Sequence, residues 1–125
     1  HPLAFLDRPL TLAELKSHAQ IVMSDSSAHR SVDAGWLGSQ QRWTVKDFHE
    51  SLNLVKQGVG HATLPVSRIQ EELASGELVE LIIEDHVRLD LSLYLVFANK
   101  KTLGPAGLLF AKLLKQQAKQ YVVDV

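Results

Sequence analysis

Cysteine is absent from the 125 residues, so the chain can form no disulfide, no thiolate nucleophile and no zinc site built on sulfur. No apolar run approaches the roughly 20 residues that a membrane-spanning helix needs. Neither sign of charge is in excess, because 13 Lys and Arg stand against 14 Asp and Glu and give a net charge of -1. Without an overall positive field, we do not expect this chain to bind DNA by itself.

What remains has the composition of a soluble globular domain, with 46% hydrophobic and 22% charged residues. This length suits one compact domain with one hydrophobic core. Methionine occurs only at Met23 and the chain opens at His1, so we expect it to be a piece of a longer polypeptide. The absence of cysteine suits a reducing, cytoplasmic compartment.

Helix-start signals mark two places in the first half of the chain. Thr11 and Glu14 form a capping box, flanked by Leu10 and Leu15, which predicts a helix from about residue 12 to 18. An apolar strand is predicted at 20–23, and residues 25–42 are predicted to be a loop. At the second place we expect Thr44 to cap a helix, with Asp47 three residues on and Trp43 packed against Phe48.

The rest of the chain alternates between strand and helix patterns. We expect the second helix to stop at Gly58, a strand at 60–64 broken by Pro65, and a helix around 69–73 that stops at Gly76. Strands at 78–83 and 88–98 follow, and Pro105 opens a last helix. This rhythm predicts an α/β fold, with a mainly parallel sheet flanked by helices.

Few residues assemble into a recognisable reaction centre. Gly58 and Gly60 lack the third glycine of a dinucleotide motif and follow a helix, so a helix end and a tight turn explain them better. The six histidines form no short pair of the kind that holds one metal ion, and we predict no metal site. His61 is the most interesting of them, although a hydrogen-bonded structural role is the simpler explanation.

Polar groups after a strand can hold a ligand without catalysing anything. Ser24, Ser26 and Ser27 follow the 20–23 strand, and parallel sheets collect ligands outside the carboxyl ends of their strands. A solvated turn explains the same residues equally well. No Gly-x-Ser-x-Gly elbow is present, so a serine hydrolase fits poorly and we predict no catalytic residues. Free amides at the second helix start could bind an anion.

Several segments in order resemble the effector-binding domain of LysR-type transcriptional regulators. The resemblance runs over essentially the whole chain, and the most specific segment is the run from Leu54 to Pro65. The other segments are His1 to Ala4, Pro9 to Leu15, Gln20 to Val22, Trp43 to Val45 and Leu73 to Leu78. Together these residues indicate a regulator family whose winged helix-turn-helix part lies outside this chain.

The resemblance implies a periplasmic-binding-protein-like fold of type 2, made of two lobes. By this alignment residues 5–90 are approximately the second lobe, and 91–125 return to the first lobe and supply its C-terminal helix. The chain then holds one complete lobe, the C-terminal part of the other, and no cofactor.

The implied function is binding of a small-molecule effector between the lobes, which changes how the intact protein engages promoter DNA and RNA polymerase. Homo-oligomers in the cytoplasm are implied as well. The residues expected to line the pocket are Ser24, Ser26, Ser27, Trp43, Thr44, His61, Thr63 and Pro65. His61 stands where the family commonly has an apolar residue, which favours an anionic or hydrogen-bonding effector. The alternative is a lobe of a periplasmic transport receptor, and an enzyme ranks third.

Overall fold

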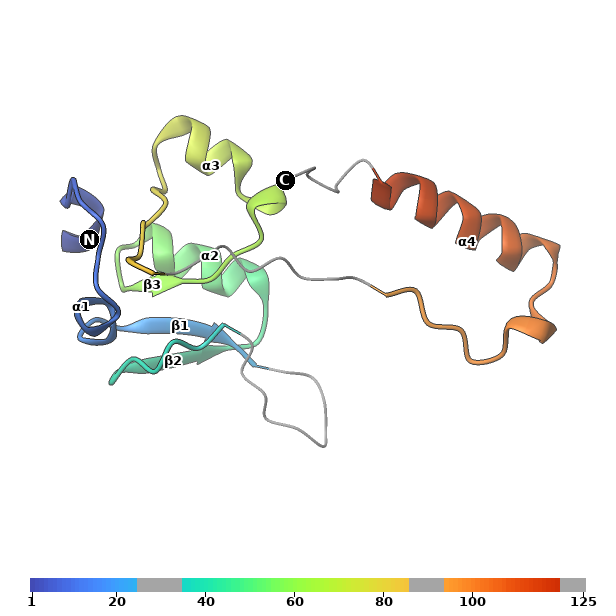
Figure 1. Ribbon diagram of the computed structural model, residues 1–125, viewed down its shortest axis with the longest axis horizontal. Helices are drawn as coiled ribbons and strands as arrows, with labels where there is room; N and C mark the ends of the chain where they lie inside the picture. The colour runs from blue at the N-terminus through green and yellow to red at the C-terminus, as the bar shows by residue number, and fades with distance from the viewer. Residues whose placement is uncertain (25–34, 86–93, 120–125) are drawn as a thin grey trace. The chain divides into compact units, whose positions relative to one another are not determined.

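The computed structural model describes residues 1–24, 35–85 and 94–119 (Figure 1). The chain divides into two compact units, His1–Val87 and Arg88–Val125, and each is described by itself. The expected strand and helix alternation is found mainly in the first unit. Among the described residues no helix is long and apolar enough to cross a bilayer.

A parallel sheet forms the centre of the first unit. Its described strands are β1 (Gln20–Met23), β2 (Arg42–Val45) and β3 (His61–Ala62), in the order β2-β1-β3. Both pairings are parallel, with Gln20 level with Arg42 on one side and with His61 on the other. The predicted parallel α/β arrangement is therefore confirmed, although β3 is shorter than the 60–64 strand we expected.

Two apolar clusters pack in the first unit, each around a different group of helices. Met23 packs with Phe48 of α2 (Phe48–Lys56) and with Leu73 of α3 (Gln70–Ser75), and these helices lie on the same side of the sheet in Figure 1. Lys56 also joins α2 to α3 through an ion pair with Glu72 at 3.3 Å. The other cluster contains Leu3, Leu10, Leu15 and Leu37, which come from η1 (Pro2–Phe5), α1 (Leu12–Lys16) and the segments beside them.

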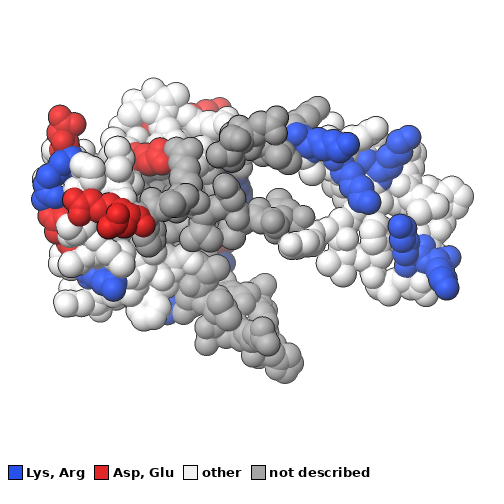
Figure 2. Space-filling model, viewed as in Figure 1, with Lys and Arg blue, Asp and Glu red and all other residues white. Residues whose placement is uncertain are grey.

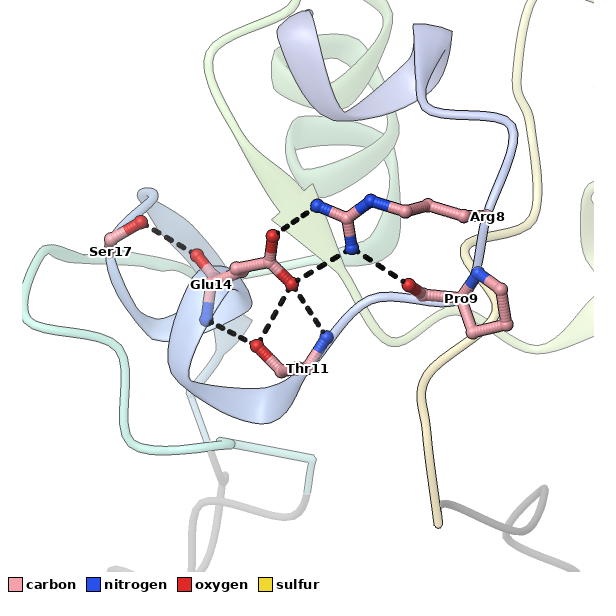
Figure 3. A network of polar contacts seen from close by, with 5 residues as sticks. All are labelled: Arg8, Pro9, Thr11, Glu14 and Ser17. Carbon is pink, nitrogen blue, oxygen red and sulfur yellow. Dashed lines mark hydrogen bonds and ion pairs between the residues drawn. The ribbon is translucent and has the colours of Figure 1, made fainter.

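The first helix begins as predicted, at a capping box (Figure 3). The Glu14 amide donates to the Thr11 hydroxyl at 3.2 Å, and the Thr11 amide donates to the Glu14 carboxylate at 2.9 Å. Arg8 donates two hydrogen bonds to the same carboxylate. The Arg8 guanidinium and then the Thr11 donors lower the pKa of Glu14 to about 2. This exposed network fixes where the chain turns into α1.

The predicted start of the second helix is wrong by three residues. Trp43 and Thr44 lie in β2, paired with β1, and Asp47 is the residue that caps α2. Trp43 is 51% exposed and precedes the helix by five residues, so it does not occupy the flanking position of a helix that is capped by Asp47. Pairing with a buried neighbouring strand outweighs a local capping signal, because Trp, Thr and Val also favour strands. The end of the helix is as predicted, since Gly58 has φ of 71°.

The predicted strand at 78–83 is also wrong. Only Ile83 makes a β-bridge there, with Leu10, supported by hydrogen bonds from the Leu10 amide to Ile82 and from the Glu84 amide to Leu10. A groove of about 300 Å³ lies between residues 3–10 and 79–82. The apolar run favours an extended chain, but an extended chain becomes a ladder only where a neighbour supplies matching donors and acceptors.

The regular structure described in the second unit consists of helices. It contains η3 (Lys100–Thr102) and α4 (Pro105–Ala118), with Pro105 in the first turn as predicted. Of the strand expected at 88–98, residues 94–98 form none, and the remainder lies outside the described residues. Tyr94 and Val96 are exposed, so this end is not buried on both sides, because no described strand pairs with it.

Candidate functional site

The carboxyl ends of the parallel strands meet at one edge of the sheet. Ser24 directly follows β1, and its amide donates to the Val45 carbonyl of β2 at 2.8 Å. This bond places Ser24 beside the end of β2, as expected for a ligand-binding edge. Its side chain is exposed. Ser26 and Ser27, the other serines expected here, lie outside the described residues.

Thr44 presents a hydroxyl close to the same edge. It lies level with Val22 in the neighbouring strand and its side chain is exposed. Within the part of the chain that the structure describes, no protein group bonds to the hydroxyl of Ser24 or of Thr44. Both hydroxyls are therefore available to a ligand. Trp43 is half exposed one position earlier in β2, where its ring can contact an apolar body.

Thr63 lies across the sheet from Thr44. Ala62, the last residue of β3, is level with Ile21 of β1, and Thr63 directly follows it. β1 lies between β2 and β3, so Thr44 and Thr63 come from elements on opposite sides of β1. The Thr63 hydroxyl donates to the Gly35 carbonyl at 3.3 Å and is exposed, as is Pro65, which precedes η2 (Val66–Arg68).

A set of polar contacts, here called the polar clamp, holds residues 35–39 against the sheet. Its centre is Gln20, which is fully buried at the start of β1. The Gln20 side chain donates to the Gly35 carbonyl at 2.6 Å and accepts from the Leu37 amide at 2.9 Å. Thr63 makes the third contact, to Gly35. One side of the candidate site is therefore joined to β1 and β3 by hydrogen bonds.

His61 lies inside the polar clamp and not at the exposed edge. Only 7% of it is exposed, and its Nε2 lies 3.2 Å from the Leu15 carbonyl and 3.3 Å from the Ser39 hydroxyl. A carbonyl oxygen only accepts, so Nε2 must carry the proton. It then cannot take a proton from Ser39, and the pair forms no activated nucleophile. Burial lowers the pKa of His61, which keeps the ring neutral at pH 7.

The structure does not bring His61 together with Ser24. His61 is level with Gln20, at the amino end of the sheet, four positions along β1 from Ser24. At about 3.3 Å per residue this is roughly 13 Å. Contact between His61 and an effector stays a prediction, and the described contacts of its ring are with the protein.

The start of α2 already holds its own carboxylates. The Glu50 amide donates to Asp47 Oδ1 at 3.0 Å, and the Lys46 amide donates to Glu50 Oε2 at 3.0 Å. These two acidic side chains occupy the donors that we expected an anion to use, and their charges repel a further anion. An anionic effector would have to be recognised by other groups.

The sequence interpretation missed Gln20, Ser39 and Trp36 as parts of this site. Gln20 carried a signal, because a long polar side chain inside an apolar strand needs a specific partner when buried. Trp36 is 46% exposed and lies under the Arg42 guanidinium, 5.4 Å from the ring centre. Among the described residues no three His, Asp or Glu side chains converge as metal ligands would.

Comparison with known proteins identifies one family. The model of the LysR substrate binding domain matches residues 1–119, nearly the whole chain. No curated protein and no solved structure matched the chain. The matched range includes both the polar clamp and the hydroxyls at the sheet edge.

Proposed function

The chain belongs to the LysR substrate binding domain family, and from this premise we propose that it senses a small-molecule effector at the carboxyl edge of its sheet. Domains of this family have the periplasmic-binding-protein-like fold and serve transcription regulators. The effector would contact Ser24, Thr44 and Thr63, with Trp43 and Pro65 as apolar walls. Ser26 and Ser27 complete the proposed set at this edge. His61, at the amino end of the sheet, stays a proposed effector contact away from this edge.

The observation that carries the proposal is the pair of free hydroxyls at this edge. Ser24 and Thr44 sit on adjacent strands, are exposed, and have no described protein partner. A hydroxyl both donates and accepts, so the pair can bind a carboxylate, an amide or a sugar hydroxyl. Thr63 adds a third polar group from the other side of β1. Neutral donors suit a hydrogen-bonding effector, and a negative charge on it would need a cationic group besides these.

Signalling requires the effector to bind two arrangements of the protein with different affinity. The polar clamp offers a physical route, because Thr63 is both a proposed effector contact and a hydrogen-bond donor to Gly35. An effector that competes for the Thr63 hydroxyl would weaken one of the bonds that hold residues 35–39. Binding at the edge would then be coupled to the position of this segment.

In the intact protein, we propose that this coupling changes engagement of promoter DNA and RNA polymerase. The regulator would be a cytoplasmic homo-oligomer without a cofactor in this domain. The family match favours a regulator over the lobe of a periplasmic transport receptor. It also favours binding over catalysis, which agrees with the protonated Nε2 of His61 beside Ser39.

The proposal can be tested by screening small carboxylates, amino acids and sugar phosphates for thermal stabilisation of the protein. A hit is then titrated against Thr44→Val, which removes the hydroxyl and keeps a branched side chain suited to a strand. Loss of one hydrogen bond of about 1 kcal/mol predicts roughly three- to tenfold weaker binding. The control is Thr102→Val, because Thr102 is an exposed threonine in η3, outside the proposed site.

Equal affinity of the Thr44→Val and Thr102→Val proteins would show that the ligand does not use this edge. If Ser24→Ala also left the affinity unchanged, the proposed site would be wrong. Stabilisation by a ligand that protects both variants as well as the parent protein would place the site elsewhere.

A further inference from the structure

A second candidate binding site lies in the C-terminal unit. Residues from η3, from α4 and from the segment before them line an open groove of about 380 Å³. Phe97, Leu108 and Ala111 supply apolar surface, and Ala111 is buried. The remaining lining residues are Lys100, Lys112, Lys115, Gln116 and Lys119. The groove therefore combines an apolar floor with ammonium groups.

All of the charged residues from 94 to 119 are lysines. In Figure 2 the described atoms of this part show blue and white only, without red. By contrast, Asp and Glu outnumber Lys and Arg in the described part of residues 1–85. The net charge of -1 for the whole chain thus conceals a strongly cationic segment, which composition alone did not reveal.

The lysines of the groove repel one another. Lys112, Lys115 and Lys119 are spaced three and four residues apart, so they share one face of α4. No ion pair joins them to any residue that the structure describes. An anion placed among them would relieve this repulsion, whereas a cation or a neutral polar molecule would not.

We propose that this groove binds a small amphipathic anion, a carboxylate or phosphate group attached to a short acyl or aryl body. The apolar body would lie on Phe97 and Leu108, and the charged head would face Lys112 and Lys115. A groove of this size falls within the range of small-molecule sites. Lysine ammonium groups act as mobile point charges, so they accept either type of head group.

This site is additional to the proposed effector site. The groove is formed by residues between 97 and 119, and the proposed effector contacts all lie between residues 24 and 65. Occupation of one site can therefore be measured without the other. Failure of the groove proposal would leave the sheet-edge proposal intact, and the reverse is also true.

The test is a titration of the full 125-residue chain with octanoate, followed by amide chemical shifts in ¹⁵N–¹H NMR spectra. We expect saturable shifts concentrated between residues 108 and 119. Lys115→Gln should weaken octanoate binding at least fivefold. Lys101→Gln, which removes the same charge from a lysine outside the groove, should change it less than twofold. Acetate should bind at least tenfold more weakly, because it lacks the apolar body.

Three results would overturn the proposal. The first is the absence of saturable shifts in α4 at concentrations at which octanoate binds elsewhere in the chain. The second is equal weakening by Lys115→Gln and Lys101→Gln, which would indicate general electrostatic attraction without a site. The third is displacement of octanoate by a short DNA duplex that binds more tightly, which would assign the lysines to phosphate backbone contacts. A dispersed spectrum in each variant confirms that the chain is folded.

Discussion

Replacing Gly60 by alanine should destabilise the first unit more than the same replacement at any other glycine that the structure describes in this unit. A Cβ atom at this position would lie 2.1 Å from the Ala19 carbonyl oxygen and 2.8 Å from its carbon. Both are backbone atoms of the chain leading into β1, so no side-chain rotation can relieve the overlap. The Gly60 and Ala19 backbones would have to separate by about 1 Å to reach ordinary contact.

That separation has a predictable energetic cost. The His61 amide donates to the same Ala19 carbonyl at 3.0 Å, and a shift of this size would break the bond that begins the pairing of β3 with β1. Overpacking costs about 1 to 3 kcal/mol, and a buried carbonyl left without a donor costs a similar amount. We expect a total of about 3 kcal/mol, against a typical domain stability of roughly 5 to 15 kcal/mol. Gly60→Val should cost more, because its side chain is larger and branched.

Urea unfolding followed by tryptophan fluorescence measures this cost, because Trp36 and Trp43 both lie in the first unit. The matched control is Gly76→Ala in the same unit. Gly76 has φ of 78° and nothing within 4 Å of its added Cβ, so alanine there meets backbone strain of about 1 kcal/mol and no clash. If Gly60→Ala destabilises the protein no more than Gly76→Ala, close approach of β3 to the Ala19 backbone is not what requires glycine.

Three further predictions concern polar groups of the first unit. Since burial lowers the pKa of His61 below its ordinary 6.5, the unfolded chain binds the proton more tightly, and stability should fall as the pH drops below about 6.5. The urea midpoint of His61→Gln should depend less on pH in this range. Parallel pH profiles of the parent protein and His61→Gln would show that His61 is not the group responsible. The Glu14 carboxyl should titrate near pH 2 in ¹³C NMR, so its contribution to stability is lost as the pH falls from 4.5 towards 2. Arg8→Gln should raise the pKa of Glu14 but leave it below 4.5, because the Thr11 donors remain. An unchanged pKa of Glu14 in Arg8→Gln would refute the role of Arg8. Gln20→Met keeps the side-chain volume but leaves the Leu37 amide without its partner and the Gly35 carbonyl with the Thr63 hydroxyl alone, at a cost of about 1 to 3 kcal/mol. Hydrogen exchange at Leu37 should accelerate, and an unchanged rate would show that Gln20 does not hold this segment.

Features that depend on neighbouring residues in the chain could be predicted from the sequence. The capping box needs only Thr11 and Glu14, which are three residues apart, and the helix end at Gly76 needs only one residue in the left-handed conformation. The apolar face of α2 followed from helical spacing, and Phe48, Leu52 and Val55 do pack in one cluster.

Features that depend on partners distant in the sequence could not be predicted. Thr44 satisfies the local rule for a helix cap, but pairing with Val22 in β1 places it in a strand instead. The apolar residues at 78–83 favour an extended chain without specifying a partner, and only Ile83 found one.

In the candidate site, too, features set by neighbouring residues could be predicted and features set by distant partners could not. Ser24 was predicted from its place after a strand of a parallel sheet, and Thr44 and Thr63 from the family resemblance. All three are exposed, and their contact with an effector stays a prediction. The burial of His61 depends on Leu15 and Ser39, which lie 46 and 22 residues away. Local sequence patterns do not report contacts between residues so far apart in the chain. The sequence therefore could not show whether His61 contacts an effector or makes structural hydrogen bonds.

A regulator of transcription that senses a ligand at this sheet edge must bind its promoter differently when the ligand is present. The most direct test measures the affinity and footprint of the full-length protein on its own promoter, with and without the ligand that stabilises this domain. We predict that the ligand changes the promoter affinity or the length of the footprint, and that Thr44→Val shifts this response to higher ligand concentrations while Thr102→Val does not. Identical promoter binding with and without saturating ligand would show that the protein does not regulate transcription through this ligand.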